Sequence, residues 1–370
     1  MAAGFREGPG GSVPRLAKEN PTMENEIAPA VPPVPAADDS AVRHHYPLAI
    51  RQASIGTAFG LFLKTMPYAL ARFGILIVVS LVTIVWALVT FGGAAFAGEK
   101  IHPIVGWGWF AVGAGAYGWA WHFIVRYALY LIKCGHVAVL TELVTRGQIG
   151  NGAEGMFAYG KRIVTERFAQ TNVLFAMDLL VEGVVRAFNR TLDWVGNLLP
   201  VPGMQGLMNI VKALLHSAST YIDETIFSYL LARNETNPWR GGQEGLIYYC
   251  QNAKPILKTA IWVVVLDKVL TVVLWGIMML PAVLVAKLFP EGSAAIWTFL
   301  VALLFAANAR SAFLEPLFLI MVMTTFHVSV ENQPINLEWD ARLTSLSGKF
   351  KELKDKAAAW VAGKPAPSAV

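Results

Sequence analysis

Long apolar runs separated by short polar stretches dominate the middle of this chain. Residues 73–97 contain no charged side chain, and the later runs 261–286 and 294–327 contain only two charged side chains each. A helix needs about 20 apolar residues to cross the ~30 Å hydrocarbon core of a bilayer. Each of these three runs therefore predicts a membrane-spanning helix.

A further span is expected over residues 104–132, directly after a short polar loop. Four glycines recur along this run: Gly106, Gly113, Gly115 and Gly118. Glycines at such spacings let a second helix approach closely, which is a common packing device in lipid. This span is therefore a candidate surface for the formation of an oligomer.

The region between these runs, residues 171–217, allows two interpretations. It contains apolar blocks at 171–188 and 198–217, separated by a Pro-Val-Pro-Gly hinge. The first block carries Asp178 and Glu182, which lie four residues apart and so share one face of a helix. The blocks are either two further spans that form a hairpin, which we favour, or amphipathic helices on the membrane surface. The predicted fold class is thus an all-α transmembrane bundle of about six spans, with four as the lower limit.

The two ends of the chain differ from this bundle, which is expected to occupy residues 46–330. Residues 1–45 include a tract rich in Pro and Ala that cannot bury enough apolar area to offset the entropy of ordering, so we expect a disordered tail. Residues 46–72 predict an amphipathic helix at the membrane interface. Residues 331–370 alternate apolar and charged side chains at helical spacing and predict a surface helix in a cytoplasmic tail.

Composition and charge agree with a membrane protein. The chain has 370 residues, of which 55% are hydrophobic and 15% are charged, whereas soluble domains carry about 25% charged residues. The net charge is +5, and the Lys and Arg residues concentrate in every second connecting segment. This bias places both termini in the cytoplasm of a multi-pass protein of the cell membrane. Because topology accounts for the positive charge, the lipid bilayer is an expected partner and nucleic acid is not.

Charged residues inside the predicted spans are the candidate site. A charge at the centre of a spanning helix costs about 2.5–3.5 kcal/mol on insertion scales, so such residues usually face the protein interior and pair. Asp267 and Lys268 are adjacent and point about 100° apart, so each needs its own partner on the next span. We expect Asp267 to pair with Arg310, and Lys268 with Glu315.

These charges have a structural and a functional interpretation. They either hold the helices in register, with Lys268 reaching to the membrane surface, or they form a polar site for a charged substrate. Asp178 and Glu182 are further candidates for such a site. The proline that follows Glu315 weakens the helix there, as in the broken helices that line cavities in transporters.

Motifs of soluble enzymes are absent from the sequence, including the Walker loop, GxSxG, HExxH and CxxC. We therefore expect neither an enzyme, nor a cofactor, nor a metal site. The two cysteines, Cys134 and Cys250, are expected to be free thiols that pack as small apolar residues.

A family resemblance adds a specific expectation. The run IWVVVLDKVL at residues 261–270 resembles a segment of the choline transporter-like family, in which a Val-rich run leads into Leu-Asp-Lys-Val at the start of a late span. The polar helix before it (residues 245–254), the run FLEPLFL (residues 313–319) and the short helix with Tyr-Ile-Asp at 221–223 are also similar. The resemblance covers about residues 105–335 and implies the movement of choline or ethanolamine across a membrane. The chain departs from the family in lacking its first span, the large extracellular loop and several other spans.

Three functions follow as alternatives. The leading one is a transporter-like protein for choline or a related small cationic amine. The second is a non-transporting membrane scaffold that recruits partners through its cytoplasmic helices and tails; a membrane enzyme that acts on lipid is a third. Buried charges that line a wet cavity would favour transport, whereas charges fully paired with one another would favour the scaffold.

Overall fold

The described part of the chain is mostly helical. The structure is a computed structural model that describes residues 46–167, 183–184, 220–287 and 294–361, all of which belong to one compact unit, residues 40–370. All of its regular elements are helices, which confirms the all-α class.

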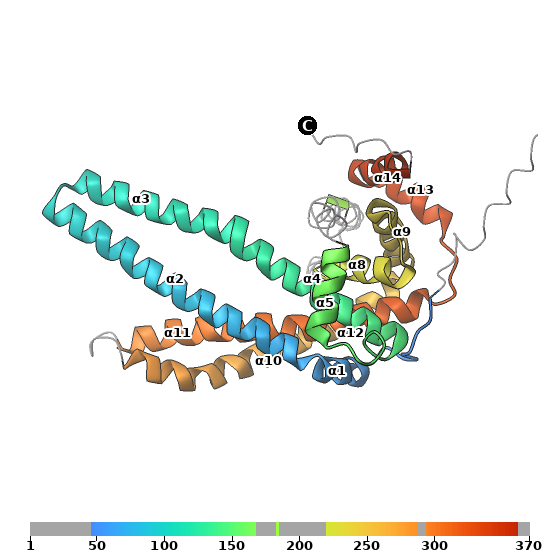
Figure 1. Cartoon of the computed structure of the whole chain (residues 1–370), viewed down its shortest axis with the longest axis horizontal. Coiled ribbons are helices and arrows are strands. Elements are labelled where there is room, and N and C mark those ends of the chain that lie inside the picture. The colour runs from blue at the N-terminus through green and yellow to red at the C-terminus, as the bar shows by residue number, and fades with distance from the viewer. Residues whose placement is uncertain (1–45, 168–182, 185–219, 288–293, 362–370) are drawn as a thin grey trace, which may run out of the picture. The chain divides into compact units, whose positions relative to one another are not determined.

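The first hairpin is formed by α2 (Met66–Lys100) and α3 (Pro103–Ala120), which run antiparallel side by side (Figure 1). The turn between them is defined by His102, whose side chain accepts a hydrogen bond from the amide of Ile104 and so caps α3. The helix continues from α3 through a π-helical turn, η2 (Trp121–Val125), into α4 (Arg126–Arg146).

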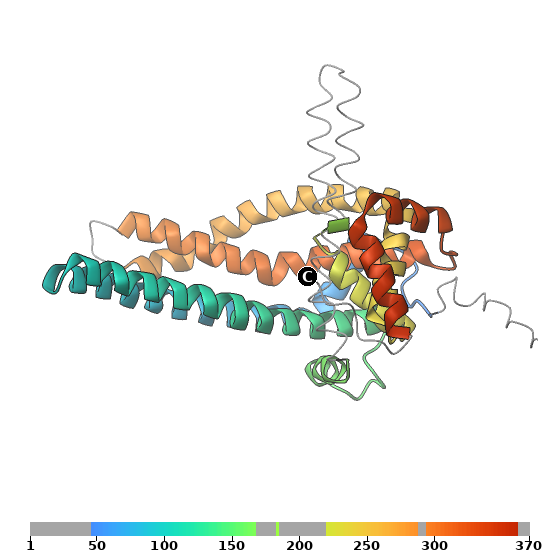
Figure 2. The ribbon, with the colours of Figure 1, turned by 90° about the horizontal axis from the view of Figure 1, so that it is seen from above.

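The second hairpin has the same construction. Helix α10 (Ala253–Ala286) pairs with α11 (Ala294–Ala309), as Figure 2 shows. Helix α11 continues through a second π-helical turn, η4 (Arg310–Leu314), into α12 (Glu315–Val330).

Four described helices are long and apolar enough to cross a membrane: Met66–Lys100, Pro103–Arg146, Ala253–Leu284 and Thr298–Val330. They coincide with the predicted spans 73–97, 104–132, 261–286 and 294–327. The predicted spans 171–188 and 198–217 lie outside the described residues, apart from residues 183–184.

The two long helices that contain a π-helical turn, α3–α4 and α11–α12, change their environment at that turn. Before the turns, the arms carry many exposed apolar side chains, such as Trp119 on α3 and Phe299 on α11. After the turns, residues 134–145 of α4 and residues 316–327 of α12 are all buried. The predicted second span, residues 104–132, is therefore shorter than the observed helix, which ends at Arg146. The last part of this helix enters a protein core, where Val137, Leu140 and Val144 are buried.

Shorter helices complete this core. They are α1 (Ile55–Lys64), α5 (Met156–Glu166), α8 (Ile222–Arg233), α9 (Pro238–Gln251), α13 (Leu337–Leu346) and α14 (Gly348–Val361). Helix α12 packs against α1, α8 and α10, which explains why it is apolar on all sides. We call this assembly of the shorter helices with α4 and α12 the helical domain.

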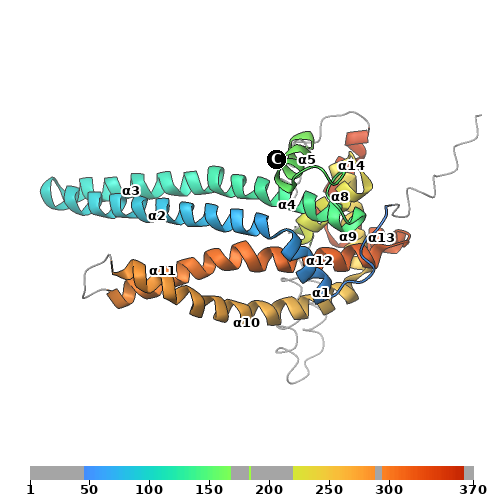
Figure 3. The same ribbon diagram turned by 60° about the horizontal axis from the view of Figure 1, so that its bottom comes forward.

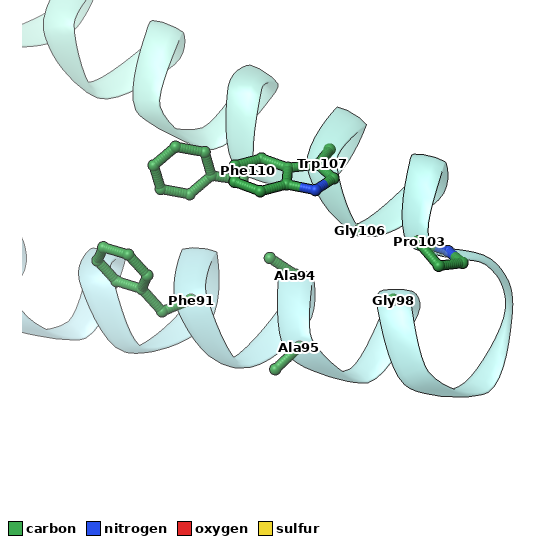
Figure 4. Close-up of a pocket in the computed structure, with 8 residues that line it drawn as sticks. All are labelled: Phe91, Ala94, Ala95, Gly98, Pro103, Gly106, Trp107 and Phe110. Atoms are coloured by element: carbon green, nitrogen blue, oxygen red, sulfur yellow. The ribbon is translucent and has the colours of Figure 1, made fainter.

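Close packing at the end of the first hairpin depends on glycine (Figure 4). A Cβ atom on Gly106 would lie 2.6 Å from the carbonyl oxygen of Ala94 and 2.8 Å from the Cα of Gly98. Gly113 is similarly close to Thr90, whereas Gly115 and Gly118 have no neighbouring atom within 4 Å. Two of the four glycines thus pack within the chain, and an oligomer through this helix remains a prediction that rests on the other two.

Replacement of Gly106 by alanine should destabilise the hairpin, because backbone atoms of α2 occupy the space that the methyl group needs. Overpacking of this kind costs about 1–3 kcal/mol, so the unfolding temperature in detergent should fall. The matched control is Gly108→Ala, since Gly108 has open space around its Cβ position. Equal unfolding temperatures for the two variants would contradict the close contact.

Candidate functional site

Four charged side chains meet where the two hairpins join the helical domain. They are Arg72 on α2, Asp267 on α10, Arg310 in η4 and Glu315 at the start of α12, and we call them the charge quartet. Arg310 Nε lies 2.8 Å from Asp267 Oδ1, and Arg72 Nη2 lies 2.8 Å from Glu315 Oε2. A longer contact of 3.7 Å joins Arg310 Nη1 to Glu315 Oε1. The quartet is therefore electrically balanced, with two cations and two anions.

The π-helical turn η4 brings two members of the quartet together. Residues five apart in an α-helix point about 140° apart around the axis. Here the amide of Glu315 donates to the carbonyl of Arg310, which is the i→i+5 bond of a π-helix. This wider turn places Arg310 and Glu315 on the same face, where Arg310 can contact both carboxylates.

Neutral polar groups support the charges. Ser311 Oγ donates to Glu315 Oε2 over 3.0 Å, and Arg72 Nη2 donates to Ser311 Oγ over 3.0 Å. One turn earlier in the helix, Asn308 Nδ2 donates to Ser80 Oγ of α2 over 2.7 Å. Polar contacts therefore join the second hairpin to α2 over two successive helical turns.

The depth of the quartet follows from the lengths of the hairpin arms. Residues 294–314, from the start of α11 to the end of η4, span about 31 Å at 1.5 Å per residue. Residues 103–125, from the start of α3 to the end of η2, span about 35 Å by the same rise. Both values match the ~30 Å hydrocarbon core, so the arms alone suffice to cross it. The quartet then lies near the edge of the apolar layer, where the arms meet the helical domain.

The structure confirms one predicted pair and contradicts the other. Asp267 pairs with Arg310, as expected. Lys268 does not pair with Glu315: it is exposed and forms no ion pair with another described residue. Because neighbouring helical residues diverge by about 100°, the inward direction of Asp267 turns Lys268 outward.

The partner of Glu315 is Arg72, which the sequence prediction missed. The feature of the sequence that could have pointed to Arg72 is its position directly before the apolar run that begins at residue 73. The other two candidates, Asp178 and Glu182, lie outside the described residues.

A second polar cluster lies inside the helical domain. His327 Nε2 is 2.7 Å from Ser228 Oγ, and His327 Nδ1 is 2.9 Å from the hydroxyl of Tyr46. Ser228 and His327 are fully buried, and burial raises the pKa of the Tyr46 hydroxyl well above its usual value. Each ring nitrogen therefore has a hydroxyl partner, one from α8 and one from the segment before α1. We therefore interpret the cluster as a hydrogen-bonded tie between α8, α12 and the segment before α1.

An apolar groove of about 740 Å³ lies between α2, α4 and α5. Its lining includes Tyr68, Ile75, Ile132 and Phe157, and Lys161 is the one charged residue among the described residues that line it. None of the quartet lines this groove or the smaller cavity at the end of the first hairpin.

Metal and thiol chemistry have little support in the described residues. No group of three or more His, Cys, Asp or Glu side chains among them could hold a metal ion. Cys134 and Cys250 are both free thiols, and burial raises the pKa of the Cys250 thiol to about 12. Cys250 is therefore protonated, and poorly nucleophilic, at neutral pH.

Comparison with known proteins places the chain in no family: no family model, no curated protein and no solved structure matches it. The helices themselves define the class. The chain is an all-α membrane protein with four described helices that are long and apolar enough to cross a membrane, two of which continue into a packed helical domain.

The Asp267–Arg310 pair should show coupling in a double-mutant cycle. Asp267→Asn and Arg310→Gln each leave a charge without its partner, so each should lower the unfolding temperature in detergent. The double variant should recover part of the loss, since couplings in membrane bundles average about 0.6 kcal/mol and reach about 1.7 kcal/mol.

The matched control cycle combines Asp267→Asn with Lys268→Gln. Lys268 is the sequence neighbour of Asp267 but points away from the quartet, so these two effects should add. Additive losses in the Asp267–Arg310 cycle as well would show that the two side chains are not coupled.

Proposed function

We propose that this protein is a non-transporting membrane scaffold, in which two apolar hairpins anchor a helical domain at one face of the bilayer. The observation that carries the proposal is the mutual pairing in the charge quartet. Each carboxylate is bonded to a guanidinium group from another helix, or from another turn of its own helix. Such a network ties the hairpins to the domain and leaves no net charge for a substrate.

The chemistry of choline also argues against the quartet as its binding site. A quaternary ammonium ion has no N–H group, so it cannot replace the charge-assisted hydrogen bonds that Arg310 gives to Asp267. Proteins usually hold such cations in cages of aromatic rings. Displacement of Arg310 by choline would exchange a strong contact for a weaker one.

The terminal helices α13 and α14 supply a surface suited to recruitment. Leu337, Leu346 and Trp360 are large apolar residues that remain exposed on them, although both helices also carry many charged residues. Contiguous apolar patches rimmed by polar residues mark protein interaction sites, and the scaffold function expects these three residues to contribute to one.

Transport of choline or a related amine is the second candidate. Its support is the resemblance of residues 261–270 and 313–319 to the choline transporter-like family, together with the π-helical turn η4 beside a charged residue and a proline. π-Helical turns occur frequently at functional sites.

Uptake of labelled choline into proteoliposomes separates the two candidates. The scaffold predicts that vesicles containing the protein take up no more choline than protein-free vesicles, at several protein densities and with either sign of membrane potential. Uptake that requires the protein and is lost in Asp267→Asn would establish transport and overturn the scaffold. A thermal unfolding curve of the reconstituted protein is the control that it is folded.

We further propose that the protein resides in the cell membrane with both termini in the cytoplasm. The support is the Lys and Arg bias of the connecting segments, and the helical domain would then lie on the cytoplasmic side. Reporter fusions at each end should be active only for a cytoplasmic reporter. A signal from a periplasmic or extracellular reporter at either terminus would contradict this topology.

A further inference from the structure

A basic cavity lies beside the start of α1, between α10 and α12. Its volume is about 570 Å³. Helix α12 contributes the buried residues Met321 and Thr325, and α10 contributes Lys258 and Trp262. Arg51 belongs to the segment that leads into α1, which packs on α12 (Figure 3).

The charge of this cavity is unbalanced, in contrast to that of the quartet. The described residues that line it include two cations, Arg51 and Lys258, and no carboxylate. Neither cation forms an ion pair or a hydrogen bond with another described residue. Two like charges beside one cavity attract an anion and repel a cation such as choline. The hydroxyl group of Ser329 also lines the cavity, whereas those of Ser54 and Thr259 bond to Thr57 and Thr325.

Exposed apolar side chains extend from the lining of the cavity along α10 and α1. Trp262 is half exposed, and Val265 and Val269 continue this exposed apolar surface along α10. On α1, Ile55, Phe59 and Leu63 are exposed at every fourth position, so they form one stripe along the helix. Tryptophan is enriched at the level of lipid headgroups, which places the cavity at the edge of the bilayer.

We propose that this cavity binds the headgroup phosphate of an anionic phospholipid. Arg51 offers a planar fork of N–H donors and Lys258 a compact ammonium group, and both suit phosphate oxygens. The acyl chains would lie along the apolar stripe of α1 and the adjacent surface of α10. A free phosphate ion would contact Arg51 and Lys258 but would not contact the apolar surface of α1 and α10. The observations therefore favour the lipid.

The proposal needs only that the chain is a membrane protein. It does not depend on whether the chain transports choline or acts as a scaffold, and its test measures lipid binding alone.

The test is a titration of the full-length protein in neutral detergent with short-chain phosphatidylglycerol, followed by the number of lipids bound in native mass spectrometry. The native protein should bind phosphatidylglycerol more tightly than phosphatidylcholine of equal chain length. The double variant Arg51→Gln/Lys258→Gln should weaken this binding by about 30-fold, since each basic side chain near a membrane surface contributes about fivefold.

The matched control is Lys64→Gln/Lys351→Gln, which removes the same charge at two exposed positions outside the cavity. It should bind phosphatidylglycerol with native affinity. Inorganic phosphate at millimolar concentration should not displace the lipid.

Three results would overturn the proposal. The first is equal binding of the two lipids by the native protein, which needs no variant and so is independent of any folding defect. The second is an equal loss of binding in both double variants, which would indicate attraction by overall charge. The third is displacement by inorganic phosphate, which would assign the cavity to a soluble anion.

Discussion

The cost of an unpaired charge near hydrocarbon is the constraint on which this structure depends. Arg72, Asp267, Arg310 and Glu315 come from two hairpins and from the start of α12, and none could remain there alone without a large loss of stability. Their mutual bonds remove that penalty only when α2, α10 and η4 are in one register. The quartet therefore specifies how the two hairpins meet, while apolar packing supplies most of the stability.

The same constraint explains why the helices α3–α4 and α11–α12 each consist of two parts. An arm of about 31–35 Å is as long as the hydrocarbon core is thick, and its side chains can stay apolar and exposed. Beyond the arm, α4 and α12 enter the helical domain, where neighbouring helices cover them completely. A π-helical turn marks the transition in each case, and in η4 it also aligns Arg310 with Glu315. The two charged sites differ in character: the quartet is neutral and paired, whereas the described residues that line the cavity beside α1 include two cations and no carboxylate.

Much of the fold could be predicted from the sequence, because a bilayer imposes a simple rule on length and polarity. The apolar runs predicted four of the described helices. The expected antiparallel arrangement of the last two spans correctly predicted the pairing of Asp267 with Arg310. The pattern could not reveal that α12 is buried in protein, since lipid and a protein core select the same apolar residues. It also could not reveal the π-helical turn, and without that turn Glu315 was assigned to Lys268 instead of Arg72. The Ser228–His327–Tyr46 cluster was missed because its members are distant in sequence and follow no local spacing.

The most direct test of the structural role of the quartet is the unfolding temperature of Asp267→Leu/Arg310→Met. This change replaces a charged pair with apolar side chains of similar size, a type of substitution that is often neutral or stabilising at buried pairs. If the pair serves to hold the hairpins together, the double variant should unfold within a few degrees of the native protein, and above both Asp267→Leu and Arg310→Met. A double variant no more stable than the weaker single variant would show that the two charges have another role, and would contradict the account.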